Sequence, residues 1–213
     1  LRLHPVDLAD PWLELQAAQL MDEAGWAFDL AQETALRSLP VAVASLLHAE
    51  IAAVFERQGM APSVVASHWQ LAGAWRAAAL QYEHAAALAL KASRRVEELG
   101  FLDAALQAYE HEHSQAQAFR VAHQALSASM AVETPGATEA RVQALQAAAS
   151  SDAQRLQALL AASRQRLCLS DGAGALEPSR QALALAQSLG HAEQQAVAAG
   201  WHGLALALVQ RNA

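Results

Sequence analysis

The 213-residue sequence is poor in several residue types, and each scarcity narrows what the protein can be. Its one cysteine, Cys168, cannot form a disulfide within the chain, which is typical of a reducing compartment. Aromatic residues make up only 5%, and alanine supplies much of the 54% hydrophobic content. We therefore expect a thin core between closely approaching helices. The length allows one or two compact domains or a short repeat array.

Positive charge is scarce too. Fourteen basic residues, of which only Lys91 is a lysine, stand against 21 acidic ones and give a net charge of -7. This balance argues against contact with nucleic acid and against a polybasic membrane surface. No apolar run reaches the roughly 18 to 20 residues that cross a bilayer, and nothing resembles a signal peptide, so we expect a cytoplasmic location. Because the chain begins at Leu1 and not at methionine, we expect a piece of a longer protein.

Strand signals are few, because β-branched residues are rare and apolar positions recur every three or four residues. The pattern predicts an all-α fold. Asp10 and Pro11 are typical of a helix start, while Gly59 and Pro62 separate two later helices. The expected early elements are a helix over 10–23, an interruption at 25–28 compatible with a short strand, and helices over 29–38 and 40–58.

Alanines at regular spacing predict a repeat over the rest of the chain. Four similar segments begin, 27, 35 and 35 residues apart, at Ala78, Ala105, Ala140 and Ala175. The longer spacing is close to the roughly 34-residue tetratricopeptide unit. Twelve residues before each of these alanines lies another small residue. These are Ala66, Ser93, Ala128 and Ser163, and Ala198 continues the series at the same spacing of 35. Two antiparallel helices approach closely only where neither presents bulk.

The fold that we predict is therefore a stack of antiparallel helical hairpins, a tetratricopeptide-like superhelix or α-solenoid. Residues 1–58 would form a helical cap and residues 59–213 the repeats. Since each hairpin contacts only its neighbours, such an array stays open and leaves an extended surface.

Candidate reactive groups do not assemble into a site. In Glu110-His111-Glu112-His113 the two histidines point about 200° apart on a helix, so we expect a polar corner between helices and not a metal site. The run Ser170 to Leu176, SDGAGAL, lacks the lysine and preceding strand of a phosphate loop and predicts a helix stop and turn. Ser151 is typical of a helix cap. Cys168 has no histidine at helical spacing, and we expect a core thiol.

The pair His68-Trp69 leaves two interpretations open. It could be a polar handle in a ligand groove, or a buried indole beside a histidine bonded to backbone or a carboxylate. We favour the second.

Residues 36–90 resemble a region of large bacterial regulators, the signal-transduction ATPases with numerous domains (STAND class) found in LuxR-type and antibiotic-regulatory activators and in some adenylate cyclase and kinase chains. The matching motifs are Leu47-His48, His68-Trp69-Gln70-Leu71-Ala72-Gly73 and Ala78-Ala79-Leu80-Gln81-Tyr82. Upstream, the segment WAFDLAQE is similar to the family's F-x-H-D-L-x-x-E, which closes a winged-helix part. Trp26, Asp29, Leu30 and Glu33 fit, and Phe28 replaces the histidine.

The resemblance implies a regulatory protein with a nucleotide-driven switch, a separate output domain and a helical array that senses a ligand or partner. This sequence contains no G-x-x-x-x-G-K-[ST] phosphate loop, so it does not include the ATPase.

The concave surface of stacked hairpins suits peptides, partner proteins or modest ligands. The small-residue register places six side chains on it: Arg94, Glu97, Ser129, Arg164, Gln195 and His202. We expect a non-enzymatic binding and regulatory module for a protein, a peptide or a small-molecule effector, with no catalytic residue, metal or cofactor. The alternative is a scaffold through which the parent chain forms homo-oligomers.

Overall fold

The computed structural model describes residues 9–22, 25–26 and 39–212, and nearly all of them are helical. The predicted all-α class is thus confirmed. The first elements are α1 (Ala9–Ala17) and a two-residue antiparallel pair, β1 (Met21–Asp22) with β2 (Gly25–Trp26). The first helix ends at Ala17 and not near residue 23, because the backbone is left-handed at Gln19 (φ 58°) before β1. Of the interruption predicted at 25–28, the first two residues form β2, and 27–28 lie outside the described residues. The helix expected over 29–38 lies outside the described residues.

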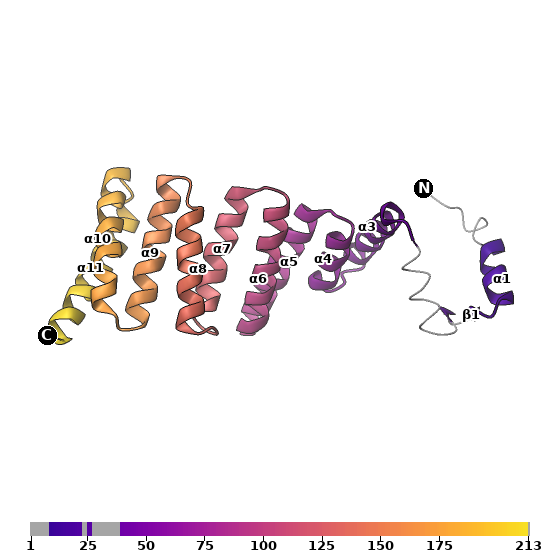
Figure 1. Cartoon of the computed structure of the whole chain (residues 1–213), viewed down its shortest axis with the longest axis horizontal. Coiled ribbons are helices and arrows are strands. Elements are labelled where there is room, and N and C mark those ends of the chain that lie inside the picture. The colour runs from indigo at the N-terminus through magenta and orange to yellow at the C-terminus, as the bar shows by residue number, and fades with distance from the viewer. Residues whose placement is uncertain (1–8, 23–24, 27–38, 213) are drawn as a thin grey trace.

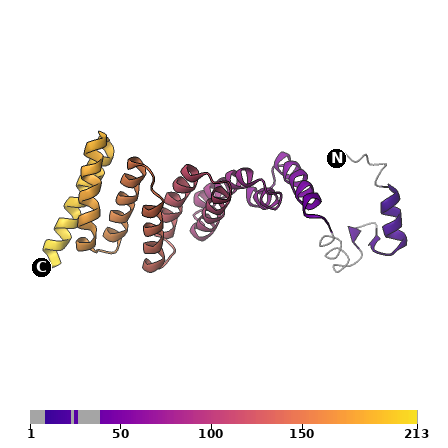
Figure 2. The ribbon, with the colours of Figure 1, turned by 45° about the horizontal axis from the view of Figure 1, so that its top comes forward.

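A continuous series of helices follows. These are α3 (Val41–Arg57), α4 (Pro62–Leu71), α5 (Trp75–Lys91), α6 (Arg95–His111), α7 (Gln115–Ser129), α8 (Pro135–Ala148), α9 (Asp152–Cys168), α10 (Gly172–Leu189) and α11 (Ala192–Asn212). Each packs against the next one in sequence. They succeed one another along one direction and do not close into a bundle (Figure 1, Figure 2). In addition, α7 contacts α9 and α9 contacts α11, so these three helices share a layer.

Most of the helices are joined by the same short turn. Its central residue has a left-handed backbone with φ between 57° and 74°, at Gly59, Gly73, Ser93, His113, Ser170 and Gly190. At the turn from α5 to α6 the Ser93 amide donates to the Leu90 carbonyl and the Arg94 amide to the Ala89 carbonyl. This pairing satisfies carbonyls that a helix end leaves free. It also reverses the chain within three residues, so successive helices run antiparallel.

Two sequence segments fall at these turns, as predicted. His111 ends α6 and His113 is the central turn residue before α7, so the glutamate–histidine cluster is a helix corner. Ser170 occupies the same position before α10, where the Asp171 side chain accepts a hydrogen bond of 2.8 Å from the Gly174 amide. Ser151 caps α9 by accepting from the Gln154 amide at 3.2 Å.

The helices do not recur at the predicted 35 residues. Alternate helices α5, α7, α9 and α11 begin at Trp75, Gln115, Asp152 and Ala192, which are 40, 37 and 40 residues apart. The observed unit is therefore longer than the roughly 34 residues of a tetratricopeptide. What the fold establishes is an open, sequentially packed helical array.

The altered spacing breaks the predicted register at two positions. Ser93 is an exposed turn residue and not part of a helix interface. Ala140 is exposed on α8, where Thr138, Val142 and Leu145 are buried in its place. The other members of the small-residue series, Ala66, Ala128, Ser163 and Ala198, are all at most 1% exposed, as predicted.

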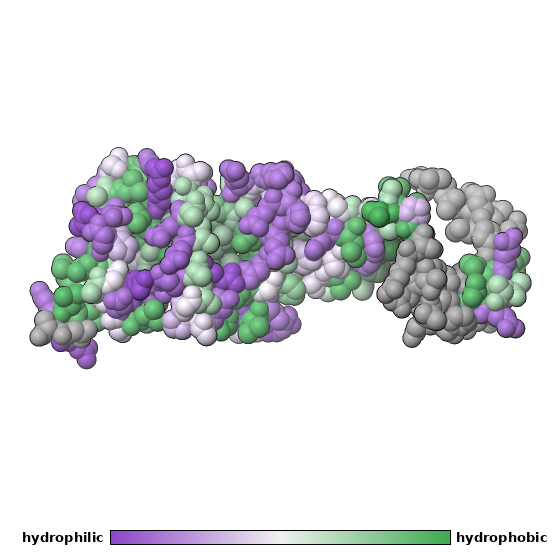
Figure 3. Space-filling view, in the orientation of Figure 1, coloured by the Kyte–Doolittle hydropathy of each residue, from purple (hydrophilic) through white to green (hydrophobic). Residues whose placement is uncertain are grey.

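Small residues make up much of the core. Helix α5 buries five alanines and no larger side chain, and the larger fully buried side chains are few: Leu126, Leu145, Leu156, Val65 and Val121. On the face shown in Figure 3, hydrophilic residues cover much of the stack and hydrophobic ones form smaller separate patches. Cys168 is exposed at the end of α9, so the prediction of a core thiol is wrong.

The boundary predicted at residue 58 stays a prediction, and α3, on its N-terminal side, packs directly on α4. Within the described ranges, every helix is too short or too polar to cross a bilayer.

Candidate ligand-binding cavity

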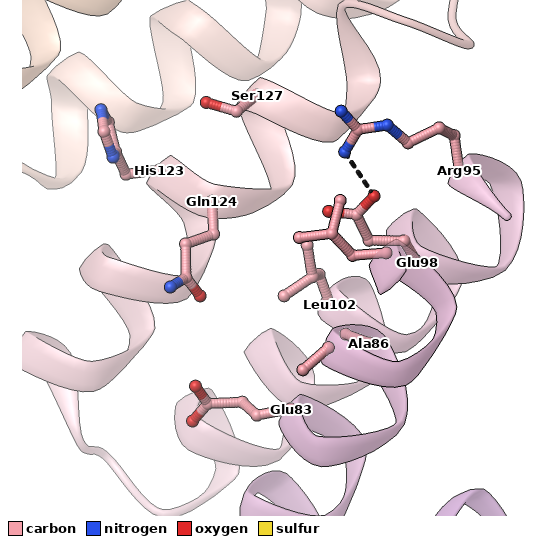
Figure 4. Close-up of a pocket in the computed structure, with 10 residues that line it drawn as sticks. Glu83, Ala86, Arg95, Glu98, Leu102, His123, Gln124 and Ser127 are labelled. Atoms are coloured by element: carbon pink, nitrogen blue, oxygen red, sulfur yellow. Dashed lines mark hydrogen bonds and ion pairs between the residues drawn. The ribbon is translucent and has the colours of Figure 1, made fainter. Parts of the chain in front are cut away.

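Helices α5, α6 and α7 enclose a cavity of about 540 Å³ (Figure 4). Its apolar lining consists of Ala86, Ala87 and Leu90 from α5 and Leu102 from α6. Its polar lining consists of Glu83 from α5, Arg95 and Glu98 from α6, and His123, Gln124 and Ser127 from α7. The volume lies in the range typical of small-ligand sites, roughly 300 to 1,000 Å³.

Glu98 is the most unusual group in this lining. It lies on the same stripe of α6 as Leu102, Ala105 and Tyr109, which are all buried, and it is itself only 6% exposed. Arg95 donates a hydrogen bond of 2.7 Å to its Oε2. Among the described residues no group donates to Oε1, and Figure 4 shows the carboxylate pointing from α6 towards α7. Burying a carboxylate is costly unless it is well paired, and here Arg95 pairs one oxygen while Oε1 stays open to the cavity.

Glu83 is, in contrast, fully occupied by protein partners. The Tyr109 hydroxyl from α6 donates to it at 2.7 Å, and the Arg120 guanidinium from α7 donates to both of its oxygens at 2.7 Å. Burial alone would raise the pKa of Glu83, but these hydrogen bonds outweigh it and lower the pKa. Burial and the bond to Glu83 raise the pKa of Tyr109 to about 12. One ionised carboxylate thus ties three consecutive helices together at the edge of the cavity.

His123 is neutral at pH 7, because burial lowers its pKa and the charge of Arg164 on α9 lowers it further. The side chains that line the cavity therefore carry two carboxylates, Glu83 and Glu98, and one guanidinium, that of Arg95.

The six predicted groove residues fall into two sets of three. Arg94 and Glu97 are exposed at the start of α6, beside Arg95 and Glu98 in sequence, and form an ion pair of 2.8 Å with each other. Arg164 is exposed on α9, close enough to influence His123. None of these three lines the cavity.

The remaining three predicted groove residues lie elsewhere. Ser129 is completely buried, and its hydroxyl donates to the Leu126 carbonyl at 3.0 Å, so the prediction that it faces a groove is wrong. Gln195 and His202 are half-buried on α11, where the His202 Nδ1 lies 3.0 Å from the Ser179 hydroxyl of α10. Neither of them reaches the cavity.

Sequence reasoning missed the residues that do line the cavity, because they come from three helices and share no local motif. One signal was available: Glu98 interrupts an otherwise apolar stripe at the spacing i, i+4, i+7 and i+11. A glutamate on a buried stripe is rare unless it has a partner.

The favoured interpretation of His68-Trp69, a buried indole beside a histidine bonded to backbone or a carboxylate, is wrong in both parts, and Trp69 is only half-buried. His68 on α4 is half-buried, and its bonding partner is His48 on α3, with 2.9 Å between the two Nδ1 atoms, where we expected backbone or a carboxylate. Phe55 packs edge-on against His68 with ring centres 5.3 Å apart. Burial lowers the pKa of His68, and the nearby His48 lowers it further.

Two smaller cavities lie further along the stack. One of about 460 Å³ is bounded by α6, α7 and α8, and one of about 270 Å³ by α8, α9 and α10. Gln165 lines the second, is 2% exposed and has an unpaired Oε1. In the described part of the chain, no three histidine, cysteine or acidic side chains gather closely enough to hold a metal ion.

Comparison with known proteins assigns this chain to no family. No protein-family model matches it, and a search of curated proteins finds no match to its sequence.

Proposed function

We propose that this chain is a non-enzymatic binding module whose ligand or partner group enters the cavity between α5 and α7. The observation that carries the proposal is the half-paired, buried Glu98 facing a cavity of about 540 Å³. A catalytic reading is less well supported. Ser127 and His123 are one turn apart on α7 but form no hydrogen bond with each other, and nucleophilic catalysis needs that contact and an oxyanion site beside it.

We further propose that the module serves a larger bacterial signalling ATPase or transcriptional regulator. The support is the resemblance of three motifs that fall in α3, α4 and α5, helices that pack directly on one another. Sequencing the DNA on both sides of the coding segment tests this part. A phosphate loop encoded upstream is the expected result, and a complete reading frame without one would remove the regulator assignment.

The binding proposal is tested by filling the cavity. Ala87 is exposed and lines it, so Ala87→Trp should occupy the space without disturbing the core. Ala116, exposed on α7 and outside the lining, provides the matched control Ala116→Trp. Thermal unfolding is followed with a library of amines, acids, sugars and short peptides. At least one compound should raise the Tm of the wild type and of Ala116→Trp but not of Ala87→Trp. No stabilising compound, or equal effects on both variants, would overturn the proposal.

A self-association scaffold is the second candidate, and exposed apolar side chains favour it. The first and last helices of the continuous stack expose the following large apolar residues: Val41, Val43, Leu46 and Leu47 on α3, and Val197, Leu204 and Leu206 on α11. Burying such surfaces against another copy would be favourable. Light scattering over a range of concentrations separates the two candidates. A binding module stays monomeric, and a scaffold gains mass with concentration.

A further inference from the structure

We propose that the cavity between α5 and α7 recognises an organic ammonium group carried on a short hydrocarbon chain. This inference rests on the proposed binding function and names the ligand class. The ammonium group would donate to the free oxygen of Glu98, and the hydrocarbon would lie against α5. A free alkylamine and a lysine side chain of a partner share this chemistry.

Glu98 determines which polar group the ligand must carry. Its Oε2 accepts a hydrogen bond from Arg95, which leaves Oε1 as the acceptor facing the cavity. Gln124 and Ser127 of α7 also line this cavity (Figure 4). The Gln124 carbonyl oxygen has only a long contact of 3.5 Å to Arg120. An ammonium group has three N–H donors and no acceptor, which matches a carboxylate together with an amide and a hydroxyl.

The sign of the ligand charge follows from the groups around Glu98. From α6, the Arg95 side chain is 45% exposed, whereas that of Glu98 is 8% exposed, so the carboxylate lies deeper. From α7, Arg120 uses both terminal nitrogens on Glu83 of α5, and neutral His123 does not oppose a cation. Arg164 is exposed on α9 and lies outside the lining. A charge-assisted hydrogen bond to the open oxygen of Glu98 therefore favours a cation over an alcohol or an acid.

The apolar lining residues determine that the rest of the ligand is a hydrocarbon chain. Ala86, Ala87 and Leu90 follow one another along α5, and Leu102 adds a side chain from α6. Because the alanines are small, a hydrocarbon chain can lie between the two helices. Each methylene removed from water should tighten binding by about fourfold.

The test is a titration of the isotope-labelled chain, followed by NMR, with hexylamine, hexanol and hexanoate. Hexylamine should shift the amide signals of Glu98 and Gln124 and bind about tenfold or more tightly than hexanol, and hexanoate should not bind. Butylamine should bind more weakly than hexylamine. A short peptide with one central lysine, compared with norleucine in its place, reports whether the lysine side chain is also accepted.

Matched variants locate the site. Glu98→Gln keeps the shape and removes the charge, and should weaken hexylamine by about tenfold or more. Glu97→Gln, at the next residue but exposed and paired with Arg94, should leave hexylamine binding unchanged. Circular dichroism checks that Glu98→Gln folds, and Ala87→Trp is a second blocking variant that keeps Glu98. Equal binding of amine and alcohol, or amine binding that survives both Glu98→Gln and Ala87→Trp, would overturn the inference.

The experiments distinguish a wrong ligand class from a cavity that binds no ligand at all. If hexylamine does not bind but another compound is lost in Ala87→Trp, the cavity binds ligands of a different class and the ammonium inference is wrong. If Ala87→Trp affects no compound, the binding proposal itself is wrong.

Discussion

Two tyrosines on neighbouring helices donate similar hydrogen bonds to acceptors of different charge. Tyr109 on α6 donates at 2.7 Å to the Glu83 carboxylate, and Tyr82 on α5 donates at 2.7 Å to the Gln70 amide oxygen. The hydrogen bond to the carboxylate should be the stronger, because an ionised acceptor roughly doubles the strength of such a bond. The difference in free energy between these two hydrogen bonds therefore reports how much the charge of Glu83 adds to the packing of α5, α6 and α7.

Replacing each tyrosine by phenylalanine tests this difference. Tyr109→Phe should lower the free energy of unfolding by about 2 kcal/mol, and Tyr82→Phe by about 1 kcal/mol. Urea unfolding measures both, and an unchanged m-value shows that the unfolded states are comparable. Equal losses in the two variants would mean that the Glu83 network adds no more than a neutral hydrogen bond.

The contact between His48 and His68 makes the junction of α3 and α4 sensitive to acid. Burial, assisted by His48, lowers the pKa of His68 below its ordinary value of 6.5. The unfolded chain therefore binds a proton more readily than the folded one. Neutral His68 therefore makes its full contribution to the free energy of unfolding above pH 6.5. This contribution is lost as the pH falls through the lowered pKa of His68.

The expected result is a free energy of unfolding that decreases from about pH 8 to pH 5 and does so more steeply in the wild type than in His68→Gln. The difference between the two curves isolates His68, because His123, whose pKa is also lowered, titrates in both proteins. Parallel curves would show that the histidine contact contributes nothing to the pH dependence.

At the scale of the element, the repeated turn is a position where the backbone conformation costs energy. Glycine occupies three of the six left-handed positions, and the other three hold Ser93, His113 and Ser170. A side chain at such a position places Cβ too close to a carbonyl oxygen, which costs about 1 kcal/mol or more. Glycine has no Cβ and avoids the cost.

Ser93→Gly should therefore raise the free energy of unfolding by about 1 kcal/mol. Ser93 is exposed, and its side chain forms no hydrogen bond within the described ranges, so little is lost with it. The reciprocal variant Gly73→Ala puts a side chain at φ 74° with open space around it, and it should destabilise by a similar amount through the backbone alone. Thermal and urea unfolding measure both. A destabilised Ser93→Gly would contradict this account of the turns.

Local signals predicted the helix ends, and long-range packing was harder to predict. Gly59, Pro62 and Ser151 each act on their own backbone, so their meaning could be read from the sequence. The register of distant helices was different. In an alanine-rich chain many spacings place alanine on alanine, so the 35-residue match predicted an interface at Ala140, which is exposed. The cavity needs three helices in their true register, and only the out-of-place Glu98 indicated it.

At the scale of the whole molecule, stability comes from overlapping groups of three helices. One core cluster joins α5 to α7, the next joins α7 to α9, and the last joins α9 to α11. Neighbouring clusters share one helix, so the array should behave as a chain of nearest-neighbour interfaces. Such a chain unfolds first at its weakest interface.

Among the interior helices α5 to α10, α8 is the most weakly packed, on three grounds. It contributes only Val142 and Leu145 to the buried apolar core, and neither of its connections contains the left-handed turn that joins most of the other helices. It also depends on a polar tether. Arg141 donates to both oxygens of Asp103 on α6, at 2.7 and 2.8 Å, and to Glu133 in the preceding loop.

We therefore expect the amide hydrogens of α8 to exchange faster than those of α6 and α10 in native-state hydrogen exchange. Leu145→Ala, which removes a side chain only 2% exposed, should cost about 2 to 4 kcal/mol and separate the unfolding of α9–α11 from that of α5–α7. Leu102→Ala on α6 is the control: it should cost a similar amount within the first cluster and leave α9–α11 unaffected. Because the middle cluster links α7 to α9, loss of Leu145 from α8 weakens the core that connects the two ends. A single transition in Leu145→Ala, with α8 exchanging as slowly as α6, would show that the array unfolds as one unit and not as a chain of neighbours.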